Sequence, residues 1–139
     1  MIKLTGQELS IEQLVSVARE HEKVSEMGDE VCQRMQRSHD WVKKAIDQPG
    51  KVIYGVNTGF GSLANRQISA GEAQKLSRNL IVLCVCGVGQ PLPEDVVRAM
   101  MLIRANMLAK GNSGVRPLVA NMLIKMLNAR VTPIVPEKG

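Results

Sequence analysis

Hydrophobic residues recur at helical spacing in two stretches near the start of the chain. The first stretch begins with a capping box, in which the side chains of Ser10 and Gln13 each bind the other residue's backbone N–H. Its apolar face consists of four residues, Ile11, Leu14, Val15 and Ala18. We therefore predict a helix that starts after Ser10 and fades near residues 24–28. The second stretch predicts a longer helix over about residues 29–47.

Three further helices are predicted in the second half of the chain, over about residues 69–86, 93–110 and 113–129. Ser69 begins a second capping box, at the start of the first of these helices. Pro93 suits the first turn of the next helix, and Gly111 is typical of the residue that follows a helix. Ser113 is the candidate cap of the last helix, which accepts Pro117 in or near its first turn.

Strand signals are few and short. Residues 2–4 predict a short strand, residues 52–54 a brief extended run, and residues 131–136 an extended tail. Aromatic residues make up only 2% of the chain, whereas sheet-rich folds are enriched in them. We therefore expect a mainly α fold with a few short strands.

Two segments of the predicted helices are apolar on nearly every side. They cover residues 80–88 and 99–108. A helix that is hydrophobic all round is normally buried inside a larger structure, and a chain of 139 residues has too little remaining sequence to surround such helices. We therefore expect them to pack against polypeptide outside this sequence or against other subunits. Within the second segment, Arg104 is expected to be a buried arginine that pairs with a carboxylate elsewhere.

The charge is uneven, but its pattern does not favour nucleic acid or membrane. Residues 1–50 hold seven Lys/Arg against nine Asp/Glu, and residues 51–139 hold eleven against four. The basic residues are dispersed and almost no aromatic residues lie between them, so we expect no nucleic-acid partner. The longest apolar run, residues 80–89, is shorter than the roughly 20 residues that span a bilayer, so we expect no membrane association.

The cysteines give no metal signature. Their spacing fits no zinc motif, and we expect no metal site. They are instead expected to be small buried residues in a reducing compartment, which indicates the cytoplasm. The three are Cys32, Cys84 and Cys86.

Residues 54–61 form the segment with the clearest chemical potential. Three glycines surround Tyr54, the only tyrosine of the chain. Glycine allows positive φ and close approach of a ligand to the backbone, and tyrosine is one of the side chains that act as general acids or bases. A second interpretation stays open, in which the segment is a simple turn whose Tyr54 and Phe60 fill the core.

The sequence Tyr-Gly-Val-Asn-Thr-Gly-Phe-Gly at residues 54–61 resembles the signature of the aromatic amino acid lyase family. This family includes histidine, phenylalanine and tyrosine ammonia-lyases and related aminomutases. The resemblance continues, in order, through further blocks that together cover nearly the whole chain, which makes the match specific. These blocks are residues 79–81, 87–92, 97–102, 104–106, 111–116 and 133–139.

The resemblance implies that residues 1–139 are the N-terminal part of an ammonia-lyase-like helical protomer. Family members are homotetramers whose active sites draw residues from more than one subunit. Their cofactor, 4-methylidene-imidazol-5-one (MIO), is formed from an internal Ala-Ser-Gly that these 139 residues do not contain. By the resemblance, that triad is expected just beyond residue 139. The chain is therefore expected to be active only together with the remaining C-terminal polypeptide.

The resemblance also implies roles for four residues. Tyr54 matches the loop tyrosine that takes the β-proton of the substrate, and Gly61 matches a loop glycine beside the cofactor. Cys84 takes the position of a substrate-contacting histidine of histidine ammonia-lyases, and Val85 follows it near the substrate and cofactor. The cysteine weakly favours phenylalanine-like substrates or an aminomutase. Alternatively, Cys84 is only a packed helix residue.

The expected activity is a carbon–nitrogen lyase reaction, the elimination of ammonia from an aromatic L-amino acid of the histidine or phenylalanine/tyrosine class. Two alternatives stay open. The first is a 2,3-aminomutase of an aromatic amino acid, which moves the amine instead of releasing it. The second is a non-catalytic helical subunit that serves only assembly.

Overall fold

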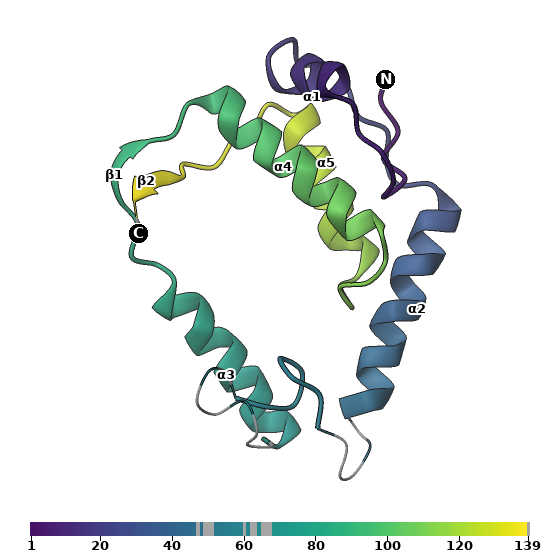
Figure 1. Ribbon diagram of the computed structural model, residues 1–139, viewed down its shortest axis with the longest axis vertical. Helices are drawn as coiled ribbons and strands as arrows, with labels where there is room; N and C mark the ends of the chain where they lie inside the picture. Colours follow the sequence, from purple (N-terminus) through teal and green to yellow (C-terminus); the bar gives the residue numbers. More distant parts are fainter. Residues whose placement is uncertain (47, 49–51, 60, 62–63, 65–67, 139) are drawn as a thin grey trace.

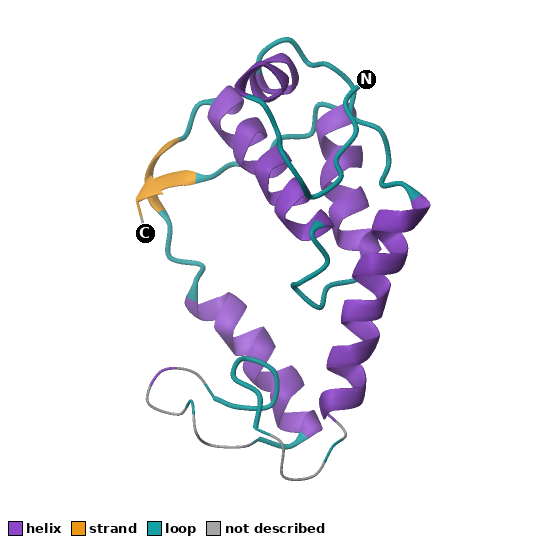
Figure 2. Cartoon of the chain, turned by 45° about the vertical axis from the view of Figure 1, so that its right-hand side comes forward, coloured by secondary structure: helices purple, strands orange, loops and turns teal. Residues whose placement is uncertain are grey.

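A computed structural model of the chain describes residues 1–46, 48, 52–59, 61, 64 and 68–138. Most of the described residues are helical, which confirms the predicted mainly α fold (Figures 1 and 2). The helices are α1 (Ile11–Ala18), α2 (Asp29–Ile46), α3 (Ala70–Leu83), α4 (Glu94–Ala109) and α5 (Pro117–Asn128). The strands are β1 (Val88–Pro91) and β2 (Pro136–Lys138).

The hydrophobic core lies between α4 and α5, with α1 packed on α4 and α2 in contact with both. Leu102 and Ala105 of α4 meet Ala120 and Ile124 of α5, and all four side chains are fully buried. Burial of a leucine or isoleucine side chain stabilises a fold by about 1.5–3 kcal/mol. These helices therefore form the stable body of the chain.

Helix α1 is shorter than predicted. It starts with the expected capping box but ends at Ala18, where the prediction extended it toward residues 24–28. The guanidinium of Arg98 donates hydrogen bonds to the backbone oxygens of Val17, at 2.8 Å, and Ala18, at 3.2 Å. The last carbonyls of α1 are thus satisfied by a distant side chain, and the chain then turns at His21, whose φ is 57°.

Arg98, and not Arg104, is the buried arginine of α4. Arg98 is 1% exposed, whereas Arg104 is exposed and pairs with no carboxylate in the described part of the chain. The prediction that Arg104 is buried does not hold within this chain, because Arg98 shares the inner face of the helix with Leu102 and Ala105, at helical spacing. Burial lowers the pKa of the Arg98 guanidinium, while the nearby Glu94 carboxylate raises it.

The beginning of α5 also differs from the prediction. The N-cap is Arg116 and Pro117 is the first helical residue, so Ser113 is not the cap. Proline suits this position because it lacks the N–H that would be unsatisfied there. The loop before Pro117 is bound to α2 by hydrogen bonds of Gly114. The N–H of Gly114 donates to Ser38 Oγ at 3.1 Å, and the backbone oxygen of Gly114 lies 2.9 Å from His39 Nδ1.

Helix α3 stands apart from the helical body and connects to it through a two-stranded ribbon (Figure 1). It ends at Leu83, three residues earlier than predicted. β1 pairs antiparallel with β2, which shares only Pro136 with the tail that was predicted to be extended. The predicted strand at residues 2–4 is wrong, because there Ile2 makes only an isolated bridge with Val24.

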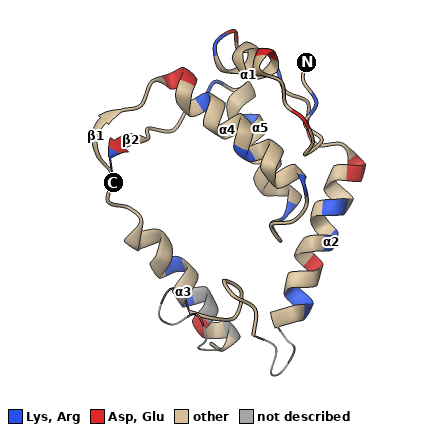
Figure 3. Cartoon of the chain, in the orientation of Figure 1, with Lys and Arg blue, Asp and Glu red and all other residues tan. Residues whose placement is uncertain are grey.

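The apolar helices are uncovered in this chain, as expected for helices that pack against further polypeptide. On α3, Ile81 and Leu83 are 68% and 75% exposed. Figure 3 shows charges of both signs along α2, whereas α4 and α5 are mostly uncharged. Within the described residues, no helix combines the length and the apolar character that crossing a membrane requires.

Candidate active site

The loop that carries Tyr54 is a tight turn between α2 and α3 (Figure 1). The N–H of Val56 donates to the oxygen of Ile53 at 3.1 Å, which closes the turn around Tyr54 and Gly55. Gly55 has a φ of 74°, in the left-handed region that glycine adopts without steric cost. The glycine after the tyrosine is therefore needed by the turn that presents it.

Two buried polar side chains stabilise this turn by hydrogen bonds to its backbone. Asn57 is 2% exposed, and its Oδ1 accepts a hydrogen bond from the N–H of Ile53 at 2.7 Å. Thr58 is 1% exposed, and its Oγ1 accepts from the N–H of Gly55 at 3.2 Å. Because both side chains bind the backbone on either side of Tyr54, they fix the position from which the tyrosine projects.

Tyr54 itself projects outward and is 65% exposed. The interpretation in which it fills the core is therefore wrong. Phe60, the other aromatic residue of that interpretation, lies outside the described residues. Tyr54 is thus a largely exposed residue on a turn whose supporting side chains, Asn57 and Thr58, are buried and hydrogen-bonded.

Gly61 lies at the other end of the loop. It is exposed, has a φ of 57°, and a Cβ added to it would meet no described atom within 4 Å. Its oxygen accepts a hydrogen bond from the N–H of Ala64 at 3.0 Å. Among the described residues, nothing therefore blocks the close approach of a ligand to the backbone of Gly61.

Cys84 and Val85 follow the end of α3. Cys84 is the C-cap residue of the helix and its side chain is exposed, as is that of Cys86. The expectation that these two cysteines are buried is therefore wrong, and Cys84 is not a packed helix residue in this chain. The reason is that α3 stands apart from the helical body. Val85 is 78% exposed.

The four predicted site residues come from the two ends of α3. Tyr54 and Gly61 precede this helix and Cys84 and Val85 follow it, and its 14 residues span about 20 Å. In the described part of the chain, no three His, Cys, Asp or Glu side chains lie close enough together to hold a metal ion. The described residues thus present an exposed tyrosine before α3 and exposed Cys84 and Val85 after it.

Sequence reasoning missed the roles of Asn57 and Thr58. Both residues belong to the motif at residues 54–61, but the sequence analysis assigned them no role. Asparagine and threonine next to glycines are nevertheless typical of side chains that bind nearby backbone groups. Their burial is what distinguishes them from ordinary turn residues.

Known proteins match this chain along nearly its whole length. The family model for aromatic amino acid lyase matches residues 9–139. The histidine ammonia-lyase of Caldanaerobacter subterraneus subsp. tengcongensis is 46% identical over 138 residues, which are 99% of this chain and 27% of that protein. The chain thus spans about 27% of the length of the curated relatives it matches.

Solved structures agree with this match. A tyrosine aminomutase from Streptomyces globisporus is 34% identical, with a TM-score of 0.88 over 99% of this chain and 26% of that protein. A histidine ammonia-lyase from Trypanosoma cruzi is 31% identical, with a TM-score of 0.84 over 99% of this chain and 27% of that protein. Since the family match begins at residue 9 and continues to residue 139, this chain belongs to the aromatic amino acid lyase family.

Proposed function

We propose that this chain supplies the base of an ammonia-lyase-type enzyme, which eliminates ammonia from an aromatic L-amino acid of the histidine or phenylalanine/tyrosine class. The observation that carries the proposal is the exposed phenol of Tyr54 on a turn that Asn57 and Thr58 hold from below. Membership of the aromatic amino acid lyase family supports it.

In the proposed elimination, Tyr54 performs one step, the removal of a proton from the substrate. The Tyr54 oxygen, in the deprotonated phenolate form, takes the proton from the β-carbon of the substrate. The bond between the α-carbon and nitrogen breaks, and the electron pair of the broken C–H bond forms a double bond between the two carbons. Ammonia leaves, and the product is an α,β-unsaturated acid. The β-proton is weakly acidic, so the reaction depends on a base held at the correct place. Asn57 and Thr58 provide that placement through the backbone.

Ammonia-lyases of this family generally use MIO, an electrophile that makes the amine a better leaving group when it is bound. The 139 residues contain no Ala-Ser-Gly, so the group would be formed by other polypeptide. The described residues fit such a neighbour, because a Cβ added to Gly61 would meet none of their atoms within 4 Å. In the proposed enzyme, Gly61 lies next to the cofactor, and Cys84 and Val85 lie near the substrate and cofactor.

We propose further that the enzyme contains a C-terminal polypeptide beyond these residues and assembles as a homotetramer in the cytoplasm. The uncovered apolar side chains of α3, α4 and α5 support additional polypeptide and subunits. The free state of the cysteines that the structure describes suits a reducing compartment. By itself the chain is expected to be inactive.

A 2,3-aminomutase is the second candidate. The likeness to a solved tyrosine aminomutase favours it, and so does the exposed cysteine at position 84, where the resemblance expects a histidine in histidine ammonia-lyases. In this reaction the amine, released from the α-carbon, adds to the β-carbon while the α-carbon gains a proton, and the product is a β-amino acid instead of free ammonia and an unsaturated acid. Analysis of the product separates the two reactions.

The experiment is the Tyr54→Phe variant in the enzyme assembled with its C-terminal polypeptide. Ultraviolet absorbance of the unsaturated acid measures turnover, and sedimentation measures assembly. We expect turnover to fall about 10²–10⁴-fold, the range that a positioned acid or base contributes, with assembly unchanged. Glu12→Gln, on helix α1 at the opposite end of the molecule from the Tyr54 loop (Figure 1), is the control and should keep its turnover. Near-normal turnover of Tyr54→Phe would remove Tyr54 from the role of base.

A further inference from the structure

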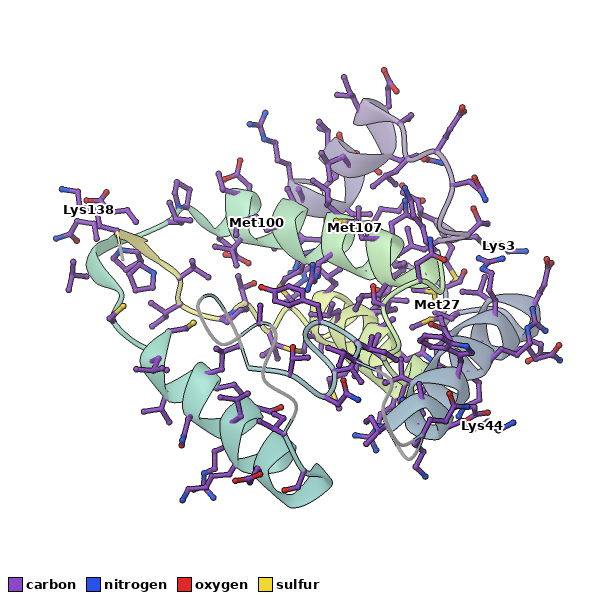
Figure 4. All side chains as sticks on the ribbon, turned by 60° about the horizontal axis from the view of Figure 1, so that its bottom comes forward. Lys3, Met27, Lys44, Met100, Met107 and Lys138 are labelled. Atoms are coloured by element: carbon purple, nitrogen blue, oxygen red, sulfur yellow. The ribbon has the colours of Figure 1, made fainter. Side chains whose placement is uncertain are left out.

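The helices α4 and α5 share an apolar surface that none of the described residues covers. We call it the α4–α5 face, and its exposed side chains belong to both helices. On α4, Met100, Ile103 and Met107 are 48%, 43% and 49% exposed. On α5, Leu118 and Met122 are 56% and 50% exposed. Figure 4 labels Met100 and Met107, which lie along the same helix. So many apolar side chains on one surface indicate an interaction site.

Two grooves run along this face. The first, of about 530 Å³, lies mainly between α4 and α5, and the second, of about 400 Å³, lies between α4 and the segment that leads to β2. Arg104 lines both grooves, and it is the only charged residue among the described residues that line them. Every other lining side chain is apolar. Arg104 therefore lies where the two grooves meet and places a single positive charge in apolar surroundings.

Arg104 has no partner of its own. In the described part of the chain, it forms neither a hydrogen bond nor an ion pair, although nearby Arg98 is fully satisfied. In water an exposed arginine is hydrated and stable. If purely apolar polypeptide covered the face, the guanidinium would be buried without a partner, which is strongly unfavourable. A stable occupant must therefore bring a carboxylate to Arg104.

The spacing of the exposed residues suggests the shape of the occupant. Met100, Ile103 and Met107 repeat at three and four positions, so they form one row along α4 about 10 Å long. Rows of this kind pack into the grooves of another helix. The occupant that fits is an apolar helix that carries one aspartate or glutamate within its contact row.

We propose that the α4–α5 face binds such a helix from the polypeptide that lies outside these 139 residues in the complete enzyme, with its carboxylate paired to Arg104. This inference rests on the proposed function, which requires that further polypeptide. The length of the relatives supports the choice of occupant, because this chain covers only about 27% of the histidine ammonia-lyases it matches. Arg104 then selects the register in which the two parts dock.

The test uses this chain together with the part of the Caldanaerobacter histidine ammonia-lyase that the chain does not match. The two polypeptides are co-expressed, and sedimentation of the purified complex gives the dissociation constant without substrate. Arg104→Gln should raise that constant at least about 30-fold, because it leaves the partner carboxylate buried and unpaired. Arg104→Lys keeps the charge and should have a smaller effect. Met122→Ser, which removes apolar contact only, should also weaken binding.

Lys110→Gln is the matched control, since Lys110 is an exposed cation at the end of α4 that lines neither groove. It should leave the dissociation constant unchanged. Arg104 is exposed and unpaired in this chain, so Arg104→Gln should also leave the circular dichroism and the urea midpoint of the chain unchanged. Weaker binding with these two readouts intact separates loss of docking from loss of folding.

Three results would overturn the inference. They are failure of the two polypeptides to bind, equal affinity of Arg104→Gln and the unchanged chain, and self-association of the chain alone that Arg104→Gln abolishes. The last result would make a second copy the occupant. Failure of the proposed function is distinguishable, because Tyr54→Phe with full turnover would contradict the role of Tyr54 while docking through Arg104 stayed intact.

Discussion

The guanidinium of Arg98 in α4 donates a hydrogen bond of 2.8 Å to the backbone oxygen of Val17 at the end of α1. The same group donates to the oxygens of Ala18 and Leu127, each at 3.2 Å. The final turns of helices carry partial negative charge, so a cation at this place is favourable. One side chain thus joins α1 and α5 to α4.

Replacement of Arg98 by methionine should therefore destabilise the chain. The variant leaves three buried carbonyl oxygens without a donor, and each such group costs about 1–3 kcal/mol. We expect the free energy of unfolding to fall by at least about 3 kcal/mol, measured by urea denaturation.

Arg104→Met supplies the control on the same helix. Arg104 is exposed and makes no ion pair within the described residues, so this variant should change the free energy of unfolding by less than about 0.5 kcal/mol. Equal effects of the two substitutions would contradict the role of Arg98.

This pair of arginines illustrates what the sequence could predict. Both lie in apolar surroundings at similar depth along the same predicted helix, and the limits of that helix were predicted nearly correctly. Which face is buried depends on where α1 and α5 pack, and the partners of Arg98 are up to 81 positions away along the chain. Local periodicity contains no information about such contacts, so the burial of Arg98 could not be predicted.

Gly6 should not tolerate a side chain. Its φ is 80°, its N–H donates to Asn106 Oδ1 at 3.0 Å, and an added Cβ would lie 2.6 Å from the backbone carbon of Ala109. Because backbone atoms cannot move aside cheaply, Gly6→Ala should lower the free energy of unfolding by about 2–3 kcal/mol. Thermal unfolding followed by circular dichroism measures the loss.

Gly71→Ala tests the same substitution at a position where the described structure leaves space for a Cβ. Gly71 lies in the first turn of α3, and an added Cβ would meet no described atom within 4 Å. Alanine favours helices over glycine by about 1 kcal/mol, so this variant should be neutral or slightly stabilising. A loss of stability as large as that of Gly6→Ala would contradict the account of Gly6.

Asn57 is expected to matter for turnover because it positions Tyr54. Asn57→Ala removes the oxygen that accepts from the N–H of Ile53 and should loosen the turn. In the assembled enzyme we expect turnover to fall about 10-fold or more, as misplacement of a base lowers the rate, with a smaller change in KM.

Asn57→Asp keeps an oxygen for the N–H of Ile53 and should recover part of the turnover. Asn112→Ala, in an exposed loop position, should have no effect. A drop in turnover that Asn57→Asp does not relieve at all would count against the positioning role.

The candidate site could be predicted only in part from the sequence. The motif at residues 54–61 identified Tyr54 as the candidate base, and its three glycines indicated a turn. The burial of Asn57 and Thr58 could not be foreseen, because it depends on how the loop folds onto itself. The pairing of Val88 with Lys138 likewise could not be predicted from the sequence, since 50 positions separate these residues and strand pairing depends on the tertiary fold.

The central claim is that this chain contributes the base of a site that other polypeptide completes. The most direct measurement is release of ammonia and unsaturated acid from aromatic L-amino acids by three samples. These are this chain alone, the complementary part of the Caldanaerobacter histidine ammonia-lyase alone, and the two combined. Turnover in the combined sample alone, lost in Tyr54→Phe, is the predicted result. Turnover by either part alone, or none in a combined sample that has assembled, would contradict the claim.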